Sequence, residues 1–283
     1  MKILILGVTG MLGSAIFKLL SNKYDVWGTI RSSSGKVFFS RELQKKMISG
    51  VDVLNQDELA NILALVKPDL VINCVGLIKQ LSNAKDPLII LPINSIFPHR
   101  LARLCGLTGT RVVHMSTDCV FSGNGAMYVE SDISDAHDLY GKSKYIGELI
   151  NYSHCITLRT SIIGHELNSK ASLVDWFLGE NDKVKGFTKA IFSGFPTHEL
   201  ATIIRDYVIP NSDLSGLYHV SAQPIDKYSL LKLIAGAYKK EIEIVADDTL
   251  VMNRSLDSTR FKETTGYKPP SWKSLVQVMF DNH

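Results

Sequence analysis

The chain has 283 residues, of which 45% are hydrophobic and 21% are charged, a composition typical of a globular protein. This length suffices for one large domain or two small ones. The net charge of +3 is too small to favour binding to nucleic acid or to a membrane surface. The sequence also has no run of about 18 apolar residues that would predict a transmembrane helix.

The cysteine pattern indicates reduced thiols. Cys74, Cys105, Cys119 and Cys155 form no C-x-x-C pair, and no group of Cys and His residues has the spacing of a zinc site. We interpret the four as buried thiols of a protein kept in a reducing compartment, which makes the cytoplasm the expected location. We predict no metal site.

Short apolar runs alternate with amphipathic stretches through the first half of the chain. In chain order, the pattern predicts a strand at 2–7, a helix at 11–22, a strand at 25–30, a helix at 56–67, a strand at 69–76, a helix at 97–107, a strand at 111–117, a helix at 138–152 and a strand at 155–164. Strands that are apolar on both faces and alternate with helices indicate a parallel sheet covered on both sides. Each crossover between these strands should be right-handed.

The second half is less regular. We expect a further strand at 216–222, a helix at 226–240 and a last helix after the two prolines Pro269 and Pro270. The sequence shows no internal repeat and no linker rich in Pro or Gly. It therefore favours an α/β fold with a doubly wound parallel sheet, built as one core with inserted lobes.

A glycine pattern follows the first predicted strand. Gly7, Gly10 and Gly13 are spaced three apart in "GVTGMLG", between that strand and the next helix. In this position the first glycine permits a tight turn, the second admits a pyrophosphate to the backbone, and the third lets helix and strand pack closely. The free N–H groups at the start of the helix also favour phosphate. The pattern predicts a dinucleotide site, and the alternative is a packing turn without a ligand.

The end of the second predicted strand bears on the choice of cofactor. An acidic residue there binds the ribose 2′-hydroxyl in proteins selective for NAD. This chain has Arg31 instead, followed by three serines that begin at Ser32. A cation and hydroxyl groups suit a 2′-phosphate, so NADP(H) is favoured over NAD(H), with a solvated loop arginine as the alternative.

Tyr140 and Lys144 lie one helical turn apart in "YGKSK". About 25 residues earlier, a predicted strand ends at Thr117, and parallel strands direct their carboxyl ends toward the cofactor crevice. A phenol whose pKa is lowered by Lys144 and by a nicotinamide charge can donate a proton to a carbonyl oxygen, which Thr117 can also hydrogen-bond. The second such pair, Tyr228 and Lys232, has no such strand before it, and we interpret it as a surface pair.

The motifs "GVTGMLG", "NCVG", "STDCVF" and "YGKSK", in this order, resemble those of extended short-chain dehydrogenases/reductases. More narrowly, the chain is similar to the dTDP-4-dehydrorhamnose reductase family, with further matches at 92–94, 158–164, 195–201 and 253–261. The resemblance spans nearly the whole chain. It implies a Rossmann domain over 1–163 and about 191–238, and a smaller C-terminal substrate-binding lobe over about 164–190 and 239–283.

The resemblance also implies roles for individual residues. Thr117, Tyr140 and Lys144 would be catalytic, with Tyr140 as the proton donor. The cofactor would contact Gly7, Thr9, Gly10, Met11, Leu12, Gly13, Arg31, Ser32, Asp52, Val53, Cys74, Val75, Gly76, Asn94, Tyr140 and Lys144. Asp118 and Arg159 would face the substrate. From the residues themselves, we add His198 beside the lobe and Arg254, whose guanidinium suits a diphosphate.

The implied activity is NADPH-dependent reduction of a nucleotide-linked 4-keto-6-deoxysugar in polysaccharide precursor synthesis. The chain departs from the family where Ile162, Ile163 and Gly164 replace frequent aromatic residues. Asp118 is followed by Cys119 rather than by the Glu of related dehydratases, which disfavours a dehydratase. The alternatives are a nucleotide-sugar C4 epimerase and a non-catalytic, NADP-binding regulatory subunit. We expect a nucleotide-sugar ligand, and a homodimer is compatible with the sequence.

Overall fold

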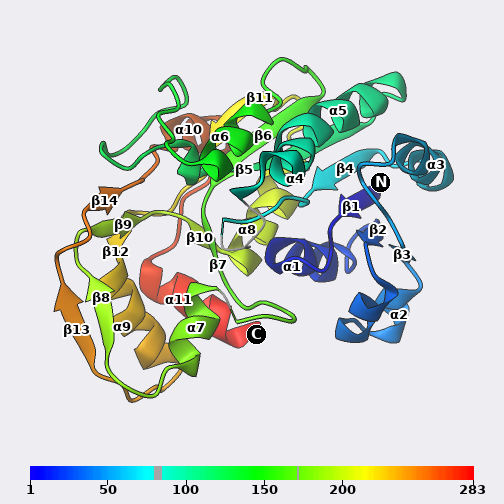
Figure 1. The fold of residues 1–283 in the computed structure, drawn as a ribbon. Coiled ribbons are helices and arrows are strands. Elements are labelled where there is room, and N and C mark those ends of the chain that lie inside the picture. Colours follow the sequence, from blue (N-terminus) through cyan, green and yellow to red (C-terminus); the bar gives the residue numbers. More distant parts are fainter. Residues whose placement is uncertain (80–84, 171) are drawn as a thin grey trace.

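The computed structural model describes residues 1–79, 85–170 and 172–283. Its centre is a parallel sheet of seven strands (Figure 1). In spatial order, the strands are β11 (Gly216–His219), β6 (Cys155–Thr160), β5 (Arg111–Thr117), β4 (Leu70–Asn73), β1 (Lys2–Leu6), β2 (Asp25–Ile30) and β3 (Met47–Ser49). The strand order reverses between β1 and β4, which makes this a doubly wound sheet with a ligand crevice expected at that point.

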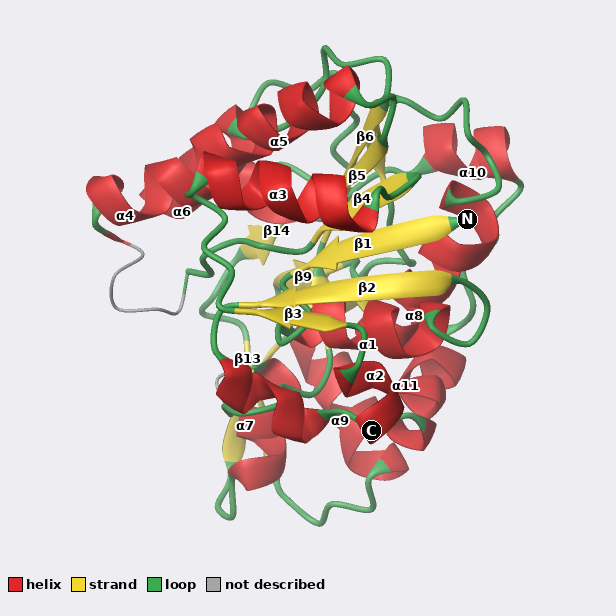
Figure 2. Cartoon of the chain, turned by 90° about the vertical axis from the view of Figure 1, so that its right-hand side faces the viewer, coloured by secondary structure: helices red, strands yellow, loops and turns green. Residues whose placement is uncertain are grey.

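Helices cover both faces of the sheet (Figure 2). They include α1 (Met11–Leu20), α3 (Gln56–Val66), α5 (Phe97–Leu107), α6 (Leu139–Ile146), α8 (Thr197–Ile203), α9 (Lys227–Ala237) and α11 (Trp272–Asp281). The remaining helical segments are α2 (Arg41–Gln44), α4 (Pro87–Leu91), α7 (Leu173–Gly179), α10 (Thr259–Thr265), η1 (Ser33–Phe38), η3 (Pro92–Ile96), η4 (Asp118–Val120) and η5 (Ile204–Val208).

Alternating side chains of β1 pack into two separate apolar clusters, one on each face of the sheet. Ile3 and Ile5 belong to a large cluster that includes α1, α8 and α11, whereas Leu4 and Leu6 pack with α3 and α5. Successive side chains of a strand point to opposite faces, so a strand buried on both sides must be apolar throughout. This requirement explains why the run at 2–6 contains almost only Ile and Leu.

A smaller lobe carries three short sheets beside the main one (Figure 1). In them, β8 (Val184–Phe187) pairs with β13 (Ile244–Asp247), β9 (Ala190–Phe192) lies between β12 (Ile225–Asp226) and β14 (Met252–Asn253), and β7 (Ile162–Ile163) pairs with β10 (Phe195–Pro196). Helix α9 packs against β8 and β13, and α11 packs against both α8 and α9. The lobe and the Rossmann core therefore share one apolar interior, and the predicted division into two units stays a prediction.

Several predicted elements end earlier than expected, and two of them differ most. The helix predicted over 138–152 ends at Ile146, and the next residue, Gly147, lies so close to another segment that a Cβ there would be 2.0 Å from the Asn94 carbonyl oxygen. The strand predicted over 155–164 is divided at Ser161. The carbonyl of Ser161 accepts a hydrogen bond of 2.8 Å from Phe195 N, which turns the chain from the main sheet into β7.

All four cysteines are free thiols. Cys105 and Cys155 are buried as expected, but Cys74 and Cys119 are only partly buried. Over the described ranges, no helix has the length and apolar character needed to cross a bilayer. Those ranges also contain no cluster of three or more His, Cys, Asp or Glu side chains suited to a metal ion.

Candidate active site

A cleft of about 800 Å³ opens at the carboxyl ends of the central strands. Residues at or after the ends of β1, β2, β4, β5 and β6 line it, together with α6, residues 166–169, 172 and 173, and parts of the lobe. Of the predicted site residues, the cleft gathers Thr9, Gly10, Met11, Leu12, Gly13, Arg31, Cys74, Val75, Gly76, Thr117, Asp118, Tyr140, Lys144 and Arg254.

The glycine turn brings α1 unusually close to β1. Gly7 has a φ of +83°, a left-handed conformation that side chains disfavour. A Cβ on Gly13 would lie 2.2 Å from the Gly7 carbonyl oxygen, so this helix position admits only glycine. Helix α1 starts after Gly10 without a side-chain cap. Its first N–H groups are therefore available to an anion in the cleft.

The loop after β2 lies against this turn. Arg31 is exposed and lines the cleft, and Ser32 starts the short helix η1, where its hydroxyl accepts a hydrogen bond from Ser34 N. A Cβ on Gly35 would lie 2.6 Å from a methyl carbon of Thr9. The Arg31 guanidinium and the serine hydroxyls thus lie beside the glycine turn that follows β1.

Helix α6 carries Tyr140 and Lys144 to the cleft. Asp138 caps its first turn by accepting a 2.8 Å hydrogen bond from Gly141 N, and it also pairs with Lys79 at 2.6 Å. A Cβ on Gly141 would lie 2.2 Å from the Cys119 carbonyl oxygen, so the glycine lets the helix approach the end of β5. The two glycines of "YGKSKYIG" therefore place the tyrosine and the lysine.

Burial controls the protonation of these groups. It raises the pKa of the Tyr140 phenol well above its usual range, and a hydrogen bond with Thr117 offsets this only in part. This result is opposite to the lowered pKa expected from Lys144, because the cost of burying the phenolate outweighs the effect of the cation. The Lys144 Nζ itself donates to the Met115 carbonyl oxygen at 2.6 Å. Burial lowers the pKa of Lys144 to about 8, against the opposing charge of Glu148. The Tyr140 phenol is thus neutral at neutral pH.

The buried side chain of Asn94 holds α6 beside the loop after β4. Its side chain is 1% exposed and bonds the backbone of Leu77 in both directions, N to Oδ1 at 2.9 Å and Nδ2 to O at 3.1 Å. Its Nδ2 also donates to Ser143 Oγ, while Ser95 Oγ donates to the Ser143 carbonyl. Asn94 therefore joins the loop after β4 to α6 and does not itself line the cleft.

The other end of the cleft mixes charges of both signs. Burial raises the pKa of Asp118, and Arg254 opposes that rise. Burial lowers the pKa of Lys227, and Asp118 opposes that fall. Arg254 Nη1 lies 3.4 Å from the Cys119 Sγ, and its buried Nε has no hydrogen-bond partner within the described residues. The cations Arg254 and Lys227 therefore offer N–H donors to an anionic ligand at this end of the cleft.

The sequence of the chain matches a family model. The model of the family described as "RmlD substrate binding domain" matches residues 1–283, the whole chain. The chain belongs to this family. The resemblance to dTDP-4-dehydrorhamnose reductases inferred from the motifs is thereby confirmed.

Individual relatives of the chain are distant in sequence. It is 25% identical to methionine adenosyltransferase 2 subunit beta from Danio rerio, over 84% of this chain and 74% of that protein. It is also 25% identical to a dTDP-4-dehydrorhamnose reductase from Aggregatibacter actinomycetemcomitans, over 98% and 97%. Among solved structures, a dTDP-4-dehydrorhamnose reductase from Bacillus anthracis in complex with NADP covers 100% of this chain and 99% of its own, with a TM-score of 0.82 and 20% identity. That likeness shows a shared fold.

Several predicted site residues lie outside the cleft lining. Gly7, Ser32 and Asn94 do not line the cleft, and Asp52 and Val53 lie in the loop after β3. Arg159 is 2% exposed, and its guanidinium forms a bidentate ion pair with Glu148. Its expected contact with the substrate does not fit this position, because a guanidinium already paired in the interior cannot reach a ligand in the cleft.

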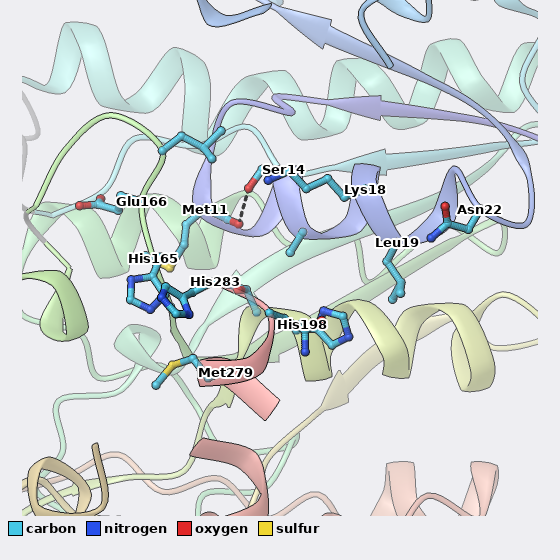
Figure 3. A pocket seen from close by; sticks show the side chains of 15 residues that line it. Met11, Ser14, Lys18, Leu19, Asn22, His165, Glu166, His198, Met279 and His283 are labelled. Atoms are coloured by element: carbon cyan, nitrogen blue, oxygen red, sulfur yellow. Dashed lines mark hydrogen bonds between the residues drawn. The ribbon is translucent and has the colours of Figure 1, made fainter. Parts of the chain in front are cut away.

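His198 lies in a second, smaller cavity of about 300 Å³, lined by residues of α1, α8 and α11 (Figure 3). Figure 3 shows it with Ser14 and Lys18 of α1 and with His165 and His283. Met11, Glu166 and Leu167 line both cavities, which adjoin there, but His198 lines only the smaller one. His198 is accordingly not placed to contact a substrate in the main cleft.

Other lining residues were not predicted from the sequence. They are Leu77, Ile78, Lys79, Met115, Ser116, Cys119, Thr160, Ser161, Ile162, Ile163, Glu166, Leu167, Asn168, Ser169, Ser172, Leu173, Ile191, Phe192, Lys227 and Met252. Lys227 is the most informative, since it begins α9 more than 80 residues after the motif of Tyr140. No local pattern marks it, and only the packing of the lobe against the sheet brings it to the cleft.

Proposed function

We propose that this protein is an NADPH-dependent reductase of a nucleotide-diphosphate 4-keto-6-deoxysugar. The observation that carries the proposal is the convergence of Thr117, Tyr140 and Lys144 with the glycine turn in one cleft. Membership of the family and the dTDP-4-dehydrorhamnose reductases among its relatives support the substrate class.

The residues at the β1 end of the cleft fit a dinucleotide. The Gly7–Gly13 turn and the uncapped start of α1 would hold the pyrophosphate, and Cys74 to Gly76 would flank the nicotinamide half. Arg31 and Ser32 would hold a 2′-phosphate, which favours NADP(H), the cofactor named for the Bacillus anthracis relative. When reduced, the bound cofactor would supply the hydride.

Tyr140 would complete the reduction by donating its phenolic proton to the C4 oxygen, so that the C=O group becomes CH–OH. A raised pKa suits this role, because it keeps the phenol protonated before the reaction. Thr117 would hydrogen-bond the same oxygen as negative charge develops on it. Lys144 would bind the nicotinamide ribose and stabilise the phenolate that remains, and solvent would return the proton.

Arg254 and Lys227 would bind the diphosphate of the substrate. Both are cations at the lobe end of the cleft, and Arg254 Nε lacks a partner within the described part of the protein. A guanidinium binds phosphate oxygens in a bidentate manner. Asp118, between the two cations and Thr117, would contact a sugar hydroxyl.

The direct test follows NADPH absorbance at 340 nm with a panel of nucleotide 4-keto-6-deoxysugars that differ in base and in C4 product. The proposal predicts stoichiometric oxidation of NADPH with at least one member and a product with a C4 hydroxyl by NMR. Tight NADPH binding without oxidation of NADPH by any member of the panel would contradict it. Interconversion of C4 epimers without net NADPH use would establish the epimerase alternative instead.

A second candidate is a cofactor-binding subunit of another enzyme. The observation in its favour is the similarity to methionine adenosyltransferase 2 subunit beta, a protein named as a subunit. This candidate predicts a partner that co-purifies from the native cell at a fixed ratio and dissociates when NADP(H) is removed. A protein that purifies alone and oxidises NADPH with a keto sugar would exclude it.

A further inference from the structure

Glu148 occupies an unusual position at the end of the Tyr140 motif. It follows Lys144 by four residues, just past the end of α6, and is 5% exposed. Its Oε1 accepts hydrogen bonds from Ser116 Oγ at 2.7 Å and from Arg159 Nε at 2.7 Å, and its Oε2 accepts one from Arg159 Nη2 at 2.8 Å. Strands β5 and β6 therefore fix one carboxylate from two sides.

Two consecutive residues at the end of β5 are tied to the α6 segment. The Met115 carbonyl oxygen accepts from Lys144 Nζ at 2.6 Å, and the Ser116 hydroxyl donates to Glu148. The next residue is Thr117, which lines the cleft and whose hydroxyl donates to Asp118 Oδ1 at 3.2 Å. A displacement of Glu148 would therefore move the strand end that supplies both the acceptor of Lys144 and the hydroxyl of Thr117.

Glu148 also affects the charge of Lys144. The groups whose charges act on the ammonium are Glu148, the Cys74 thiol and His114, and the Arg159 guanidinium pairs with Glu148 from its other side. Burial raises the pKa of Cys74 to about 12 and lowers that of His114 well below its usual value, so both are neutral at pH 7. Glu148 is therefore the negative charge among these groups, and the Arg159 cation offsets part of its effect on Lys144.

Arg159 is held on its far side by a neutral imidazole. Arg159 Nη1 lies 3.2 Å from His219 Nε2, and His219 Nδ1 lies 2.9 Å from the Tyr128 carbonyl oxygen. Burial lowers the pKa of His219 to about 4, so Nδ1 carries the proton and Nε2 accepts from the guanidinium. The interior pair is thus fully hydrogen-bonded and adds no further negative charge near Lys144.

We propose that Glu148 is a positioning residue of this cleft: it holds the end of β5 against α6 and keeps the Lys144 ammonium charged beside Tyr140. The catalytic role of the Lys144 charge rests on the proposed function. The protonation state of Lys144 can be measured without any turnover. A protein that reduces no keto sugar would refute the proposed reductase and leave this inference untouched.

The test separates the charge of Glu148 from its contribution to folding. Glu148→Gln alone leaves Arg159 buried and unpaired, which destabilises proteins strongly. The double variant Glu148→Gln/Arg159→Met removes both charges at similar volume and leaves the Ser116 hydroxyl a partner. Arg159→Lys is the matched control, because it weakens the bidentate pair and the fold but keeps the carboxylate charged.

The readout is the titration of Lys144, followed by competitive acetylation with acetic anhydride between pH 6 and 11 and quantified by mass spectrometry. The double variant should shift the midpoint down by about half a pH unit, because the loss of the Arg159 cation offsets part of the loss of the carboxylate, and Arg159→Lys should leave it near the wild-type value despite lower thermal stability. The NADPH dissociation constant of the double variant at pH 8 should rise roughly twofold, as the charged fraction of Lys144 falls. A wild-type midpoint in the double variant, or an equal shift in both variants, would overturn the proposal.

Discussion

Gly13→Ala tests the contact that brings α1 to the cleft. The added Cβ would lie 2.2 Å from the Gly7 carbonyl oxygen and 3.1 Å from the Val8 Cα, both backbone atoms that cannot rotate away. An ordinary carbon–oxygen contact is about 3.3 Å, so α1 must retreat by roughly 1 Å. Overpacking of this kind costs about 1–3 kcal/mol, which lowers the melting temperature of a chain of this size by roughly 2–10 °C.

Two other glycines provide controls for this prediction. Gly236 near the end of α9 has open space around it, so Gly236→Ala should leave the melting temperature unchanged or raise it slightly. A Cβ on Gly10 would meet the Gly7 oxygen at 3.4 Å, an ordinary contact, so Gly10→Ala should lose NADPH affinity without losing stability. Thermal unfolding and NADPH fluorescence titration measure the two quantities. A wild-type melting temperature for Gly13→Ala would refute the packing argument.

Three further predictions concern charges at and beside the cleft. Arg31→Ala should weaken NADPH binding at least tenfold and leave NADH binding unchanged in fluorescence titrations, because it removes a charge-assisted bond to the 2′-phosphate; an equal loss for both cofactors would contradict it. Arg254→Gln should raise the dissociation constant of a nucleoside diphosphate about tenfold by calorimetry, and a matching change for NADPH would count against the assignment. Burial lowers the pKa of His219 from the usual 6.5 to about 4. Neutral His219 therefore contributes stability that is fully present above pH 6.5 and is lost as the pH falls toward 4, by about 3 kcal/mol in total. His219→Gln, which can still accept from Arg159 and donate to Tyr128, should therefore lose less stability between pH 7 and 4.5 in urea unfolding; identical losses in both proteins would refute this.

The parallel sheet was predictable because its cause is local. Strands such as 2–6 are apolar on both faces, and that pattern occurs in sequence before any packing is known. The short strands of the lobe were largely missed for the opposite reason. Segments such as β12 and β14 have two residues each, and their pairing with β9 depends on contacts between parts of the chain that lie far apart in sequence.

The residues of the site were likewise predicted only in part. Motif residues such as Tyr140 and Lys144 entered the cleft as expected, because the glycines near them allow the close approach that places them. Arg159 was misjudged, since its strand leads to the cleft but its side chain turns inward to Glu148. In the protein alone the pKa of Tyr140 is raised, because the cost of burying a phenolate exceeds the help that a neighbouring cation gives. The lowering expected from Lys144 together with a nicotinamide charge stays a prediction.

The most direct test of the central claim compares two tyrosine substitutions. Tyr140→Phe removes the proposed proton donor, and Tyr228→Phe removes the hydroxyl of the exposed Tyr228–Lys232 pair, whose atoms lie 3.5 Å apart. With a nucleotide 4-keto-6-deoxysugar that the unaltered protein reduces, kcat should fall at least a hundredfold in Tyr140→Phe, with NADPH affinity nearly unchanged, and stay at the wild-type value in Tyr228→Phe. Retention of kcat in Tyr140→Phe would contradict the account.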